Sequence, residues 1–484
     1  MLSPIEIFEA LMFLLVTPGL LIPLVDREVS GGKSRAYSFL GYLSVAILAG
    51  ALILTLVLAL ELSSLGQGIF ALEDTLLFDR YSAYLGVLVS LGTLLVAVAS
   101  VPEVKGWSTA PSFYSLLLLT LAGVLTMLFV SDMATLLSAW TLVAVASYVV
   151  VGLKKDDPRS LEGAAKYGLM GVASSSLMVL GIAVLVGLTG TSFLPESIKI
   201  SGFQMSLILV TLIVLVASFG FKLGIFPFHA WLPDVYGGVH PLLVSYIAGV
   251  VKMAAIAGIL RMVLPLVGST GSQNWLHVWG LLAVLTMTYG NMVALVQKNV
   301  QRMMAYSSIA HAGYLLVGFA AVADPPSRVT GLQGVALHLT TYVLAKVGIF
   351  VGLAYLIRRG LGTTLEDMRG IGRKMPALSL GIAVLLLSLM GMPPLLGFWS
   401  KFTYLFLSVV DTAPWLTLIA ILNSGISVGY YAQVLRYMFF KEGGEGAPAE
   451  RASDPEVVVV VLTAILSVVL GLGLAQPIAE AFGP

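Results

Sequence analysis

The sequence predicts an all-α, polytopic membrane protein with 14 transmembrane helices, of which the seventh and the twelfth are interrupted. Of the 484 residues, 58% are hydrophobic and 11% are charged, whereas a soluble domain carries about 25% charged residues. The mean hydropathy is +0.99. Lipid requires every backbone polar group to be bonded within the chain, which leaves helices or a closed barrel. The apolar runs have about twice the length of a barrel strand and do not alternate with polar positions, so they predict helices.

Fourteen apolar runs are long enough to cross a bilayer. A window of about 19 residues places them at 7–25, 37–60, 76–101, 112–130, 133–153, 163–188, 203–226, 237–266, 275–296, 305–322, 331–357, 376–406, 414–440 and 456–482. The chain begins with the acidic stretch MLSPIEIFE. A secretory signal peptide begins with basic residues, so we expect the first run to be a retained helix.

The distribution of basic residues predicts how the chain is oriented. Eighteen of them fall in loops that follow odd-numbered runs and four in loops that follow even-numbered runs. The positive-inside rule therefore places the odd loops in the cytoplasm and both termini on the outer side of the cell membrane. The eighteen are Arg27, Lys33, Arg35, Lys105, Lys154, Lys155, Arg159, Lys166, Lys298, Arg302, Arg358, Arg359, Arg369, Arg373, Lys374, Arg436, Lys441 and Arg451, and the four are Arg80, Lys199, Arg261 and Arg328.

The remaining four lysines, Lys222, Lys252, Lys346 and Lys401, fall inside apolar runs. A charged side chain near the bilayer centre costs about 2.5 to 3.5 kcal/mol, so these lysines should face a polar interior or one another. Snorkelling to the membrane surface is the alternative. It suits Lys222 and Lys401, which lie near helix breaks, better than the two mid-span lysines.

The first break is predicted in FKLGIFPFHAWLPD, residues 221 to 234, where Pro227 interrupts the seventh run. Proline has no amide hydrogen, so it frees the carbonyl of Leu223, beside Lys222. We expect the lysine to use that acceptor. His229 and His240 flank the following loop, where they fit a water entrance.

The second break is predicted in GMPPLLGFWSK, residues 391 to 401. Pro393 and Pro394 free the carbonyls of Leu389 and Met390, and Lys401 follows two turns later on nearly the same face. Paired interrupted helices are a sign of repeated transporter architecture. The two breaks are five helices apart, which predicts inverted repeats of helices 4–8 and 9–13. The predicted domains are therefore 1–110, 111–267, 268–441 and a linker with helix 14 at 442–484.

A row of ionisable side chains lies in the eleventh apolar run. His338, Tyr342 and Lys346 are spaced four and four, which puts them on one helix face, and His311 lies in the preceding run. This spacing suits a proton relay, because histidine exchanges protons near neutral pH. For His311 alone, a helix-packing contact is the alternative.

Several kinds of site are not expected. The chain has no cysteine, which excludes thiolate metal sites and iron–sulfur ligation. The five histidines lie on different segments without a mid-span carboxylate, so no metal site is predicted. We expect no cofactor and no redox centre in this chain. A net charge of +1 argues against nucleic acid as a partner.

Five stretches carry a resemblance to a known family: FPFHAWLPDVYGGVHPLLVSYIAGVVK, ALVQKNVQRMMAYSSIAHAGY, ALHLTTYVLAKVGIF, GMPPLLGFWSKF and LNSGISVGYYAQVLRYMFF. They resemble the antiporter-type membrane subunits shared by respiratory complex I (subunits L, M and N), Mrp cation/proton antiporters (subunits A and D) and energy-converting membrane-bound hydrogenase-like complexes. The resemblance runs from about residue 112 to residue 440. The length favours the D, M or N type.

The resemblance implies roles for the buried lysines and histidines. Lys222 matches the broken-helix lysine of the first half-channel, and Lys252 matches the lysine that links the halves. His311 and His338 match the central polar axis. Lys346 and Lys401 match the lysines of the second half, with Lys401 at the proton exit. Many members carry a second histidine where this chain has Tyr342.

One departure concerns the fifth helix. The family usually has a Trp-Glu pair there, whose glutamate pairs with the broken-helix lysine, whereas this chain has Thr141 after Trp140. Asp132 is nine residues earlier, about 13 Å along a helix, which is too far for pairing with Lys222. Either a neighbouring subunit supplies the acid or the first half-channel has lost ordinary coupling.

The leading hypothesis is a non-redox, ion-translocating subunit of an energy-converting membrane complex, such as an NADH-quinone oxidoreductase or an Mrp-type antiporter. Its partners would be other membrane subunits, the lipid bilayer, and H⁺ or Na⁺, with protons favoured because sodium sites use carboxylate or carbonyl oxygens. Two alternatives are a structural spacer whose channel has decayed and a standalone secondary transporter.

Overall fold

The computed structural model describes residues 3–29, 33–65, 68–194, 205–269, 274–442 and 449–481. Within these ranges 13 helices are long and apolar enough to cross a membrane, or 14 if a pair of helices bent by 117° around residue 375 is one span. The predicted all-α polytopic fold is confirmed. Lys199 and the outermost residues of the seventh and fourteenth apolar runs lie outside the described residues.

The helix ends follow from the sequence. Proline stands at the first turn of several helices, where its missing amide hydrogen costs nothing, as Pro414 does in α18 (Pro414–Phe440). Acidic or amide side chains cap others. Asp79 accepts from the backbone of Ser82, and Asp132 accepts from the backbone of Thr135. For this reason the predicted run 414–440 coincides with α18, and most others agree within a few residues.

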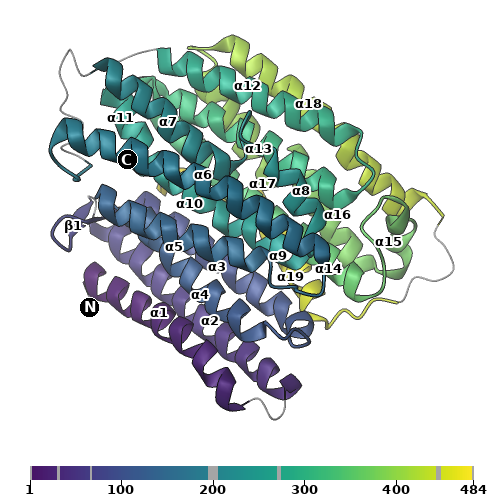
Figure 1. Ribbon diagram of the computed structural model, residues 1–484. Coiled ribbons are helices and arrows are strands. Elements are labelled where there is room, and N and C mark those ends of the chain that lie inside the picture. The colour runs from purple at the N-terminus through teal and green to yellow at the C-terminus, as the bar shows by residue number, and fades with distance from the viewer. Residues whose placement is uncertain are drawn as a thin grey trace. The chain divides into compact units, whose positions relative to one another are not determined.

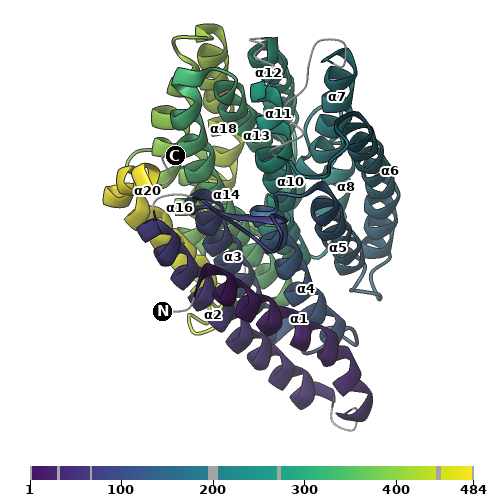
Figure 2. The same cartoon turned by 90° about the vertical axis from the view of Figure 1, so that its left-hand side faces the viewer.

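The described residues form two compact units, which the contacts between helices define. The first unit consists of residues 1–223 and 250–272. In it α5, α6 and α7 are successive neighbours, as Figure 2 shows. Its elements are α1 (Pro4–Val29), α2 (Lys33–Leu65), β1 (Ile69–Ala71), β2 (Leu76–Phe78), α3 (Arg80–Val104), α4 (Ala110–Phe129), α5 (Met133–Val151), α6 (Pro158–Thr189), α7 (Met205–Leu223), α10 (Lys252–Gly258), the π-helix η4 (Ile259–Val263) and α11 (Leu264–Ser269).

The second unit consists of residues 224–249 and 273–484. Here α14 packs against α13, α16 and α19 (Figure 1). Its elements are α8 (Trp231–Gly238), α9 (Pro241–Tyr246), α12 (Asn274–Leu295), α13 (Val300–Val322), η5 (Pro325–Ser327), α14 (Arg328–Arg358), η6 (Glu366–Met368), α15 (Ile371–Lys374), α16 (Pro376–Met390), α17 (Leu396–Phe398), the π-helix η7 (Trp399–Phe406), η8 (Leu407–Val409), α18, α19 (Pro455–Val469), the π-helix η9 (Leu470–Leu474) and α20 (Ala475–Ala481). A further π-helix, η3 (Ile247–Val251), crosses from this unit into the first.

Both predicted interruptions are present. The helix α7 ends at Leu223 and is followed by Gly224 with φ of +75°. The helix α16 ends at Met390 and is followed by Gly391 with φ of +89°. Glycine has no Cβ, so it adopts these left-handed angles without strain. Each helix therefore ends a few residues before the prolines that the sequence analysis identified.

Two features of the first unit were not predicted. The strands β1 and β2 form an antiparallel hairpin between α2 and α3. They have three residues each, too few to show an alternating pattern. Arg261, assigned to a loop from the sequence, lies instead in η4 within a candidate span and forms an ion pair with Asp79 at 2.5 Å. That assignment was wrong, because a half-buried carboxylate partner allows an arginine within a span.

Candidate functional site

Six buried side chains form one hydrogen-bonded chain through the second unit. They come from α13, α14, α18 and η7, and each has an exposed fraction of 0%. In the order of their contacts they are Lys346, Ser307, Tyr431, His311, His338 and Ser400. Buried polar groups are costly unless they are bonded, so a fully bonded series has a defined geometry.

The hydrogen-bonded chain begins at Lys346 on α14. Its Nζ donates to the Oγ of Ser307 at 2.8 Å and to the carbonyl oxygen of Met304 at 3.0 Å. The Oγ of Ser307 lies 2.5 Å from the hydroxyl of Tyr431. That hydroxyl lies 3.1 Å from Nε2 of His311. A tyrosine on α18 therefore connects the lysine to the first histidine.

Two stacked histidines continue the chain. The imidazole rings of His311 and His338 lie 5.1 Å apart with an interplanar angle of 21°. Nδ1 of His311 is 3.0 Å from Nε2 of His338. Nδ1 of His338 is 3.2 Å from the Oγ of Ser400, which donates to the carbonyl oxygen of Gly397 at 3.2 Å. The chain therefore ends at the residue before Lys401.

The partners at the two ends of the hydrogen-bonded chain are consistent with one common direction for its bonds. A lysine amine donates to Ser307, which leaves the serine's own hydrogen for Tyr431. Ser400 gives its hydrogen to a backbone carbonyl, so it accepts from His338. With both imidazoles carrying their hydrogen on Nδ1, every bond between Lys346 and Ser400 points the same way.

Lys401 occupies the second helix break. Its Nζ donates to the carbonyl oxygens of Leu389 and Met390, at 2.8 and 3.4 Å, and to the Oγ of Ser424 at 2.9 Å. The ring of Tyr314 lies 4.5 Å away. The expectation that this lysine uses the two freed carbonyls is confirmed. Lys401 lies in a π-helix, a form that is frequent at functional sites.

Tyr342 lies beside the chain. Its ring centroid is 5.7 Å from Nζ of Lys346 and 6.0 Å from the ring of His311. The spacing of four and four predicted a relay along one face of α14. The bonds described above instead pass from α14 to α13, α18 and back to α14, because Ser307 and Tyr431 lie between the lysine and the histidines.

The first break differs from the second. Nζ of Lys222 is buried and has no hydrogen-bond partner among the residues that the structure describes. It lies 5.0 Å from the ring of Trp140 and 5.6 Å from the ring of Tyr148. The expected bond to the carbonyl of Leu223 is therefore wrong, since the amine points toward the rings of α5. Ring faces attract a protonated amine.

Thr141, at the position of the absent glutamate, is exposed and donates to the carbonyl oxygen of Leu137 at 2.8 Å.

Lys252 is buried at the start of α10, directly after a π-helix. Of the loop histidines, His229 lies 4.3 Å from the ring of Tyr289, and His240 caps α9.

Comparison with known proteins identifies the family. The family described as NADH:quinone oxidoreductase/Mrp antiporter, TM, matches residues 130–427, which is more than half of the chain. The chain belongs to this family. The expectation drawn from the five sequence stretches is thereby confirmed.

Several proteins match nearly the whole length of this chain. F(420)H(2) dehydrogenase subunit N of Methanosarcina mazei is 32% identical and covers 96% of this chain and 95% of its own. A chain of respiratory complex I from Thermus thermophilus is 28% identical, with a TM-score of 0.80, and covers 98% of this chain and 100% of its own. A chain of an archaeal membrane-bound sulfane sulfur reductase has a TM-score of 0.86 at 22% identity, covering 99% and 96%, and shares the fold.

Sequence reasoning missed four polar residues that this antiporter-family chain places at the site: Ser307, Ser400, Ser424 and Tyr431. For two of them, the position in the sequence could have indicated a place at the site. Ser400 precedes Lys401, and Ser307 lies one helical turn before His311. For Tyr431 there was no such indication, because it is 120 residues from His311 and reaches it only through the packing of α18.

Proposed function

We propose that this chain moves protons across the cell membrane as a non-redox subunit of a multi-subunit energy-converting complex. The observation that carries the proposal is the hydrogen-bonded chain from Lys346 to Ser400, in which every bond points the same way when both imidazoles carry their hydrogen on Nδ1. Such a chain passes a proton by short hops, and each group moves one hydrogen to its neighbour.

The transfer can be written link by link. The protonated amine of Lys346 gives a hydrogen to Ser307, which gives its own to Tyr431. The tyrosine gives its hydrogen to Nε2 of the first histidine, which releases the hydrogen on Nδ1 to Nε2 of the second. The second histidine releases its Nδ1 hydrogen to Ser400, whose own hydrogen must turn away from the carbonyl oxygen of Gly397 before it can pass to the neutral amine of Lys401, the next residue. One proton leaves Lys346 and one reaches Lys401.

After one transfer every bond in the chain is reversed. The hydroxyl groups have to rotate and both imidazoles have to return to the Nδ1 tautomer before a second proton can follow. The hydrogen-bonded chain therefore carries one proton per cycle, and its hydroxyl orientations and tautomers must be restored before the next one. A pumping subunit requires such a step, because an open water channel would let protons flow back.

The lysines favour H⁺ over Na⁺ as the cargo. Na⁺ is bound by carboxylate and carbonyl oxygens, whereas a lysine amine is a donor that repels a cation. At the second break Lys401 already occupies the two free carbonyls, of Leu389 and Met390. We assign Lys222 and Lys252 to a corresponding path in the first of two inverted repeats, helices 4–8 and 9–13, in a chain with both termini on the outer side.

The test uses the assembled complex that contains this chain, reconstituted in lipid vesicles. Lys346→Met and Lys401→Met each remove an amine while keeping most of the side-chain volume. We expect both to lower proton movement at least tenfold. Lys166→Met is the matched control, because Lys166 lies in an exposed ion pair with Glu162. Proton movement equal to the control in both variants would refute the proposal.

A spacer role is the second candidate for the first unit, because among the described residues Lys222 faces two aromatic rings and forms no ion pair. Lys222→Met decides between them. A loss of proton movement assigns the first unit to transport. An unchanged rate, in a complex that stops with Lys401→Met, assigns it to connecting neighbouring subunits. Solute uptake by the purified chain alone would instead indicate a standalone transporter.

A further inference from the structure

The C-terminal helix connects the two elements that carry the second unit's lysines. It consists of α19, η9 and α20, and it packs against α14, α16 and α17. Lys346 lies on α14, while Lys401 lies just after α17 in the broken helix. Three sets of contacts along the C-terminal helix determine where these elements lie relative to each other.

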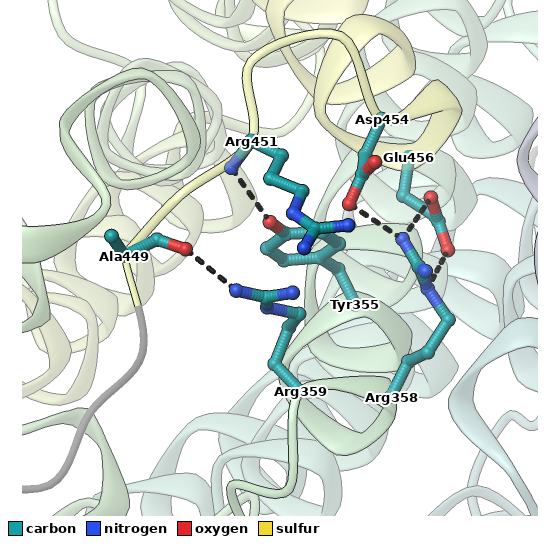
Figure 3. A network of polar contacts seen from close by, with 7 residues as sticks. All are labelled: Tyr355, Arg358, Arg359, Ala449, Arg451, Asp454 and Glu456. Carbon is teal, nitrogen blue, oxygen red and sulfur yellow. Dashed lines mark hydrogen bonds and ion pairs between the residues drawn. The ribbon is translucent and has the colours of Figure 1, made fainter.

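The first set joins the start of the helix to the end of α14 (Figure 3). Arg358 forms ion pairs with Asp454 at 2.8 Å and with Glu456 at 2.7 Å. Glu456 has an exposed fraction of 2%, so this pairing is shielded from solvent. Arg359 next to it donates to the carbonyl oxygen of Ala449 at 2.7 Å. These bonds fix the axial position of α19 along α14.

The second set is a close seam between α14 and α19. Gly348 and Gly352 form a GxxxG pattern on α14, two residues after Lys346. A Cβ on Gly348 would collide with the Oγ1 of Thr463 on α19 and with Leu385 on α16. A Cβ on Gly352 would lie 2.9 Å from Ile382 on α16 and at the ordinary contact distance of 3.5 Å from Val460 on α19. Small residues at this spacing let two membrane helices approach closely. The seam therefore leaves no room for a side chain between α14 and α19 at Gly348.

The third set reaches the helix break itself. A Cβ on Gly471 of η9 would lie 2.5 Å from the backbone nitrogen of Leu396. The Oγ of Ser467 donates to the Oγ of Ser388 at 2.8 Å. Ser388 in turn accepts from the backbone nitrogen of Gly397 at 3.3 Å, so its hydroxyl bridges both sides of the break. Leu337, Leu396, Ala475 and Ala479 pack together beside these contacts.

We infer that the C-terminal helix is a strut that positions the broken helix, so that Ser400 meets His338 and Lys401 meets its carbonyl acceptors. Gly471 and Ser467 are its positioning residues. This inference rests on the proposed proton path. The bond that depends on the strut most directly joins His338 on α14 to Ser400 on η7 at 3.2 Å.

The size of the effect follows from the distances. An added Cβ at position 471 needs about 3.5 Å from its neighbours but finds a nitrogen at 2.5 Å, so the break or the strut must retreat by about 1 Å. A hydrogen bond of 3.2 Å does not survive an increase of that size. The proton path would then be interrupted between His338 and Ser400.

The experiment compares Gly471→Ala with Gly473→Ala in the assembled complex in vesicles. Both changes put alanine into the same π-helix, but a Cβ on Gly473 meets no atom within 4 Å. We expect Gly471→Ala to lower proton movement at least tenfold and Gly473→Ala to leave it unchanged. Equal rates in the two variants, while Lys401→Met still stops transport, would overturn the strut and leave the proposed function standing. An unaffected rate in Lys401→Met would overturn the proposed function itself.

A second pair keeps the test independent of assembly defects. Ser467→Ala removes the hydroxyl that holds Ser388, while Ser467→Thr keeps it. We expect the alanine variant to lose transport and the threonine variant to recover it. Because the chain has no cysteine, a cross-link between Leu337→Cys and Leu396→Cys reports the spacing of α14 and α17. Its yield should fall in Gly471→Ala, and an unchanged yield alongside lost transport would also refute the strut.

Discussion

Tyr431→Phe is the sharpest test of the hydrogen-bonded chain. In the described part of the chain the tyrosine hydroxyl joins the Oγ of Ser307, at 2.5 Å, to Nε2 of His311, at 3.1 Å. Phenylalanine keeps the ring and its packing in α18 but removes this link. The lysine end and the histidine end of the path are then separated, although every lysine and histidine is still present.

The expected loss can be worked from the two bonds. Removing the hydroxyl leaves one buried donor and one buried acceptor unsatisfied, and each costs about 1 to 3 kcal/mol. A barrier increase of about 1.4 kcal/mol lowers a rate tenfold. We therefore expect proton movement to fall about tenfold if one of the two costs enters the barrier and about a hundredfold if both do.

A tyrosine outside the path provides the control. Tyr114 of α4 has an exposed fraction of 0%, as Tyr431 has, and its hydroxyl accepts from the Oγ of Ser100 at 3.3 Å. Tyr114→Phe thus removes the same atom and one buried bond without interrupting the path. The assay is the initial rate of vesicle acidification or alkalinisation per assembled complex, together with the thermal stability of each variant. Equal rates in Tyr114→Phe and Tyr431→Phe would refute the path through α18.

Three further outcomes are expected. Ser400→Ala should lower proton movement in vesicles at least tenfold, because His338 loses its acceptor. Ser408→Ala is the control and should leave the rate unchanged, because the Ser408 hydroxyl donates to the carbonyl oxygen of Leu405 in its own helix turn. Thr141→Glu should raise the rate about two- to tenfold relative to Thr141→Gln, because only the carboxylate gives Lys222 a counter-charge; a rate equal to that of the glutamine variant would contradict this. Transport should continue in sodium-free buffer and slow about twofold or more in D₂O, and dependence on Na⁺ would argue against a proton path.

Most of the fold could be predicted because one physical requirement dominates it. A chain in lipid must be helical, so the length of each apolar run sets each helix, and loop prolines and caps set the ends. The second break was predictable for a similar reason. Pro393 and Pro394 free two carbonyls by the loss of amide hydrogens, and the lysine two turns later was bound to compete for them.

The remainder depends on contacts that no local pattern encodes. Tyr431 enters the path only because α18 packs beside α13, and hydropathy does not determine which helices become neighbours. The π-helix around Lys401 likewise has no sequence signal. The direction of Lys222 depends on whether the freed carbonyl or the rings of Trp140 and Tyr148 attract it more, a balance of a few kcal/mol that spacing cannot decide.

The two helix breaks hold their lysines by different chemistry, and this difference bears on what each unit can do. Lys401 donates to three oxygens, and a neutral amine still has two hydrogens for the same acceptors, so the side chain can stay in place when it gains or loses a proton. At Lys222 the ring faces attract only the charged form, by about 0.5 to 2 kcal/mol each. Its neutral form gains nothing from them. On the proposed proton path, the second unit would exchange protons without moving its lysine, whereas in the first unit the loss of a proton would release the side chain. Thr141→Glu tests whether a carboxylate at that position supplies Lys222 with a fixed partner.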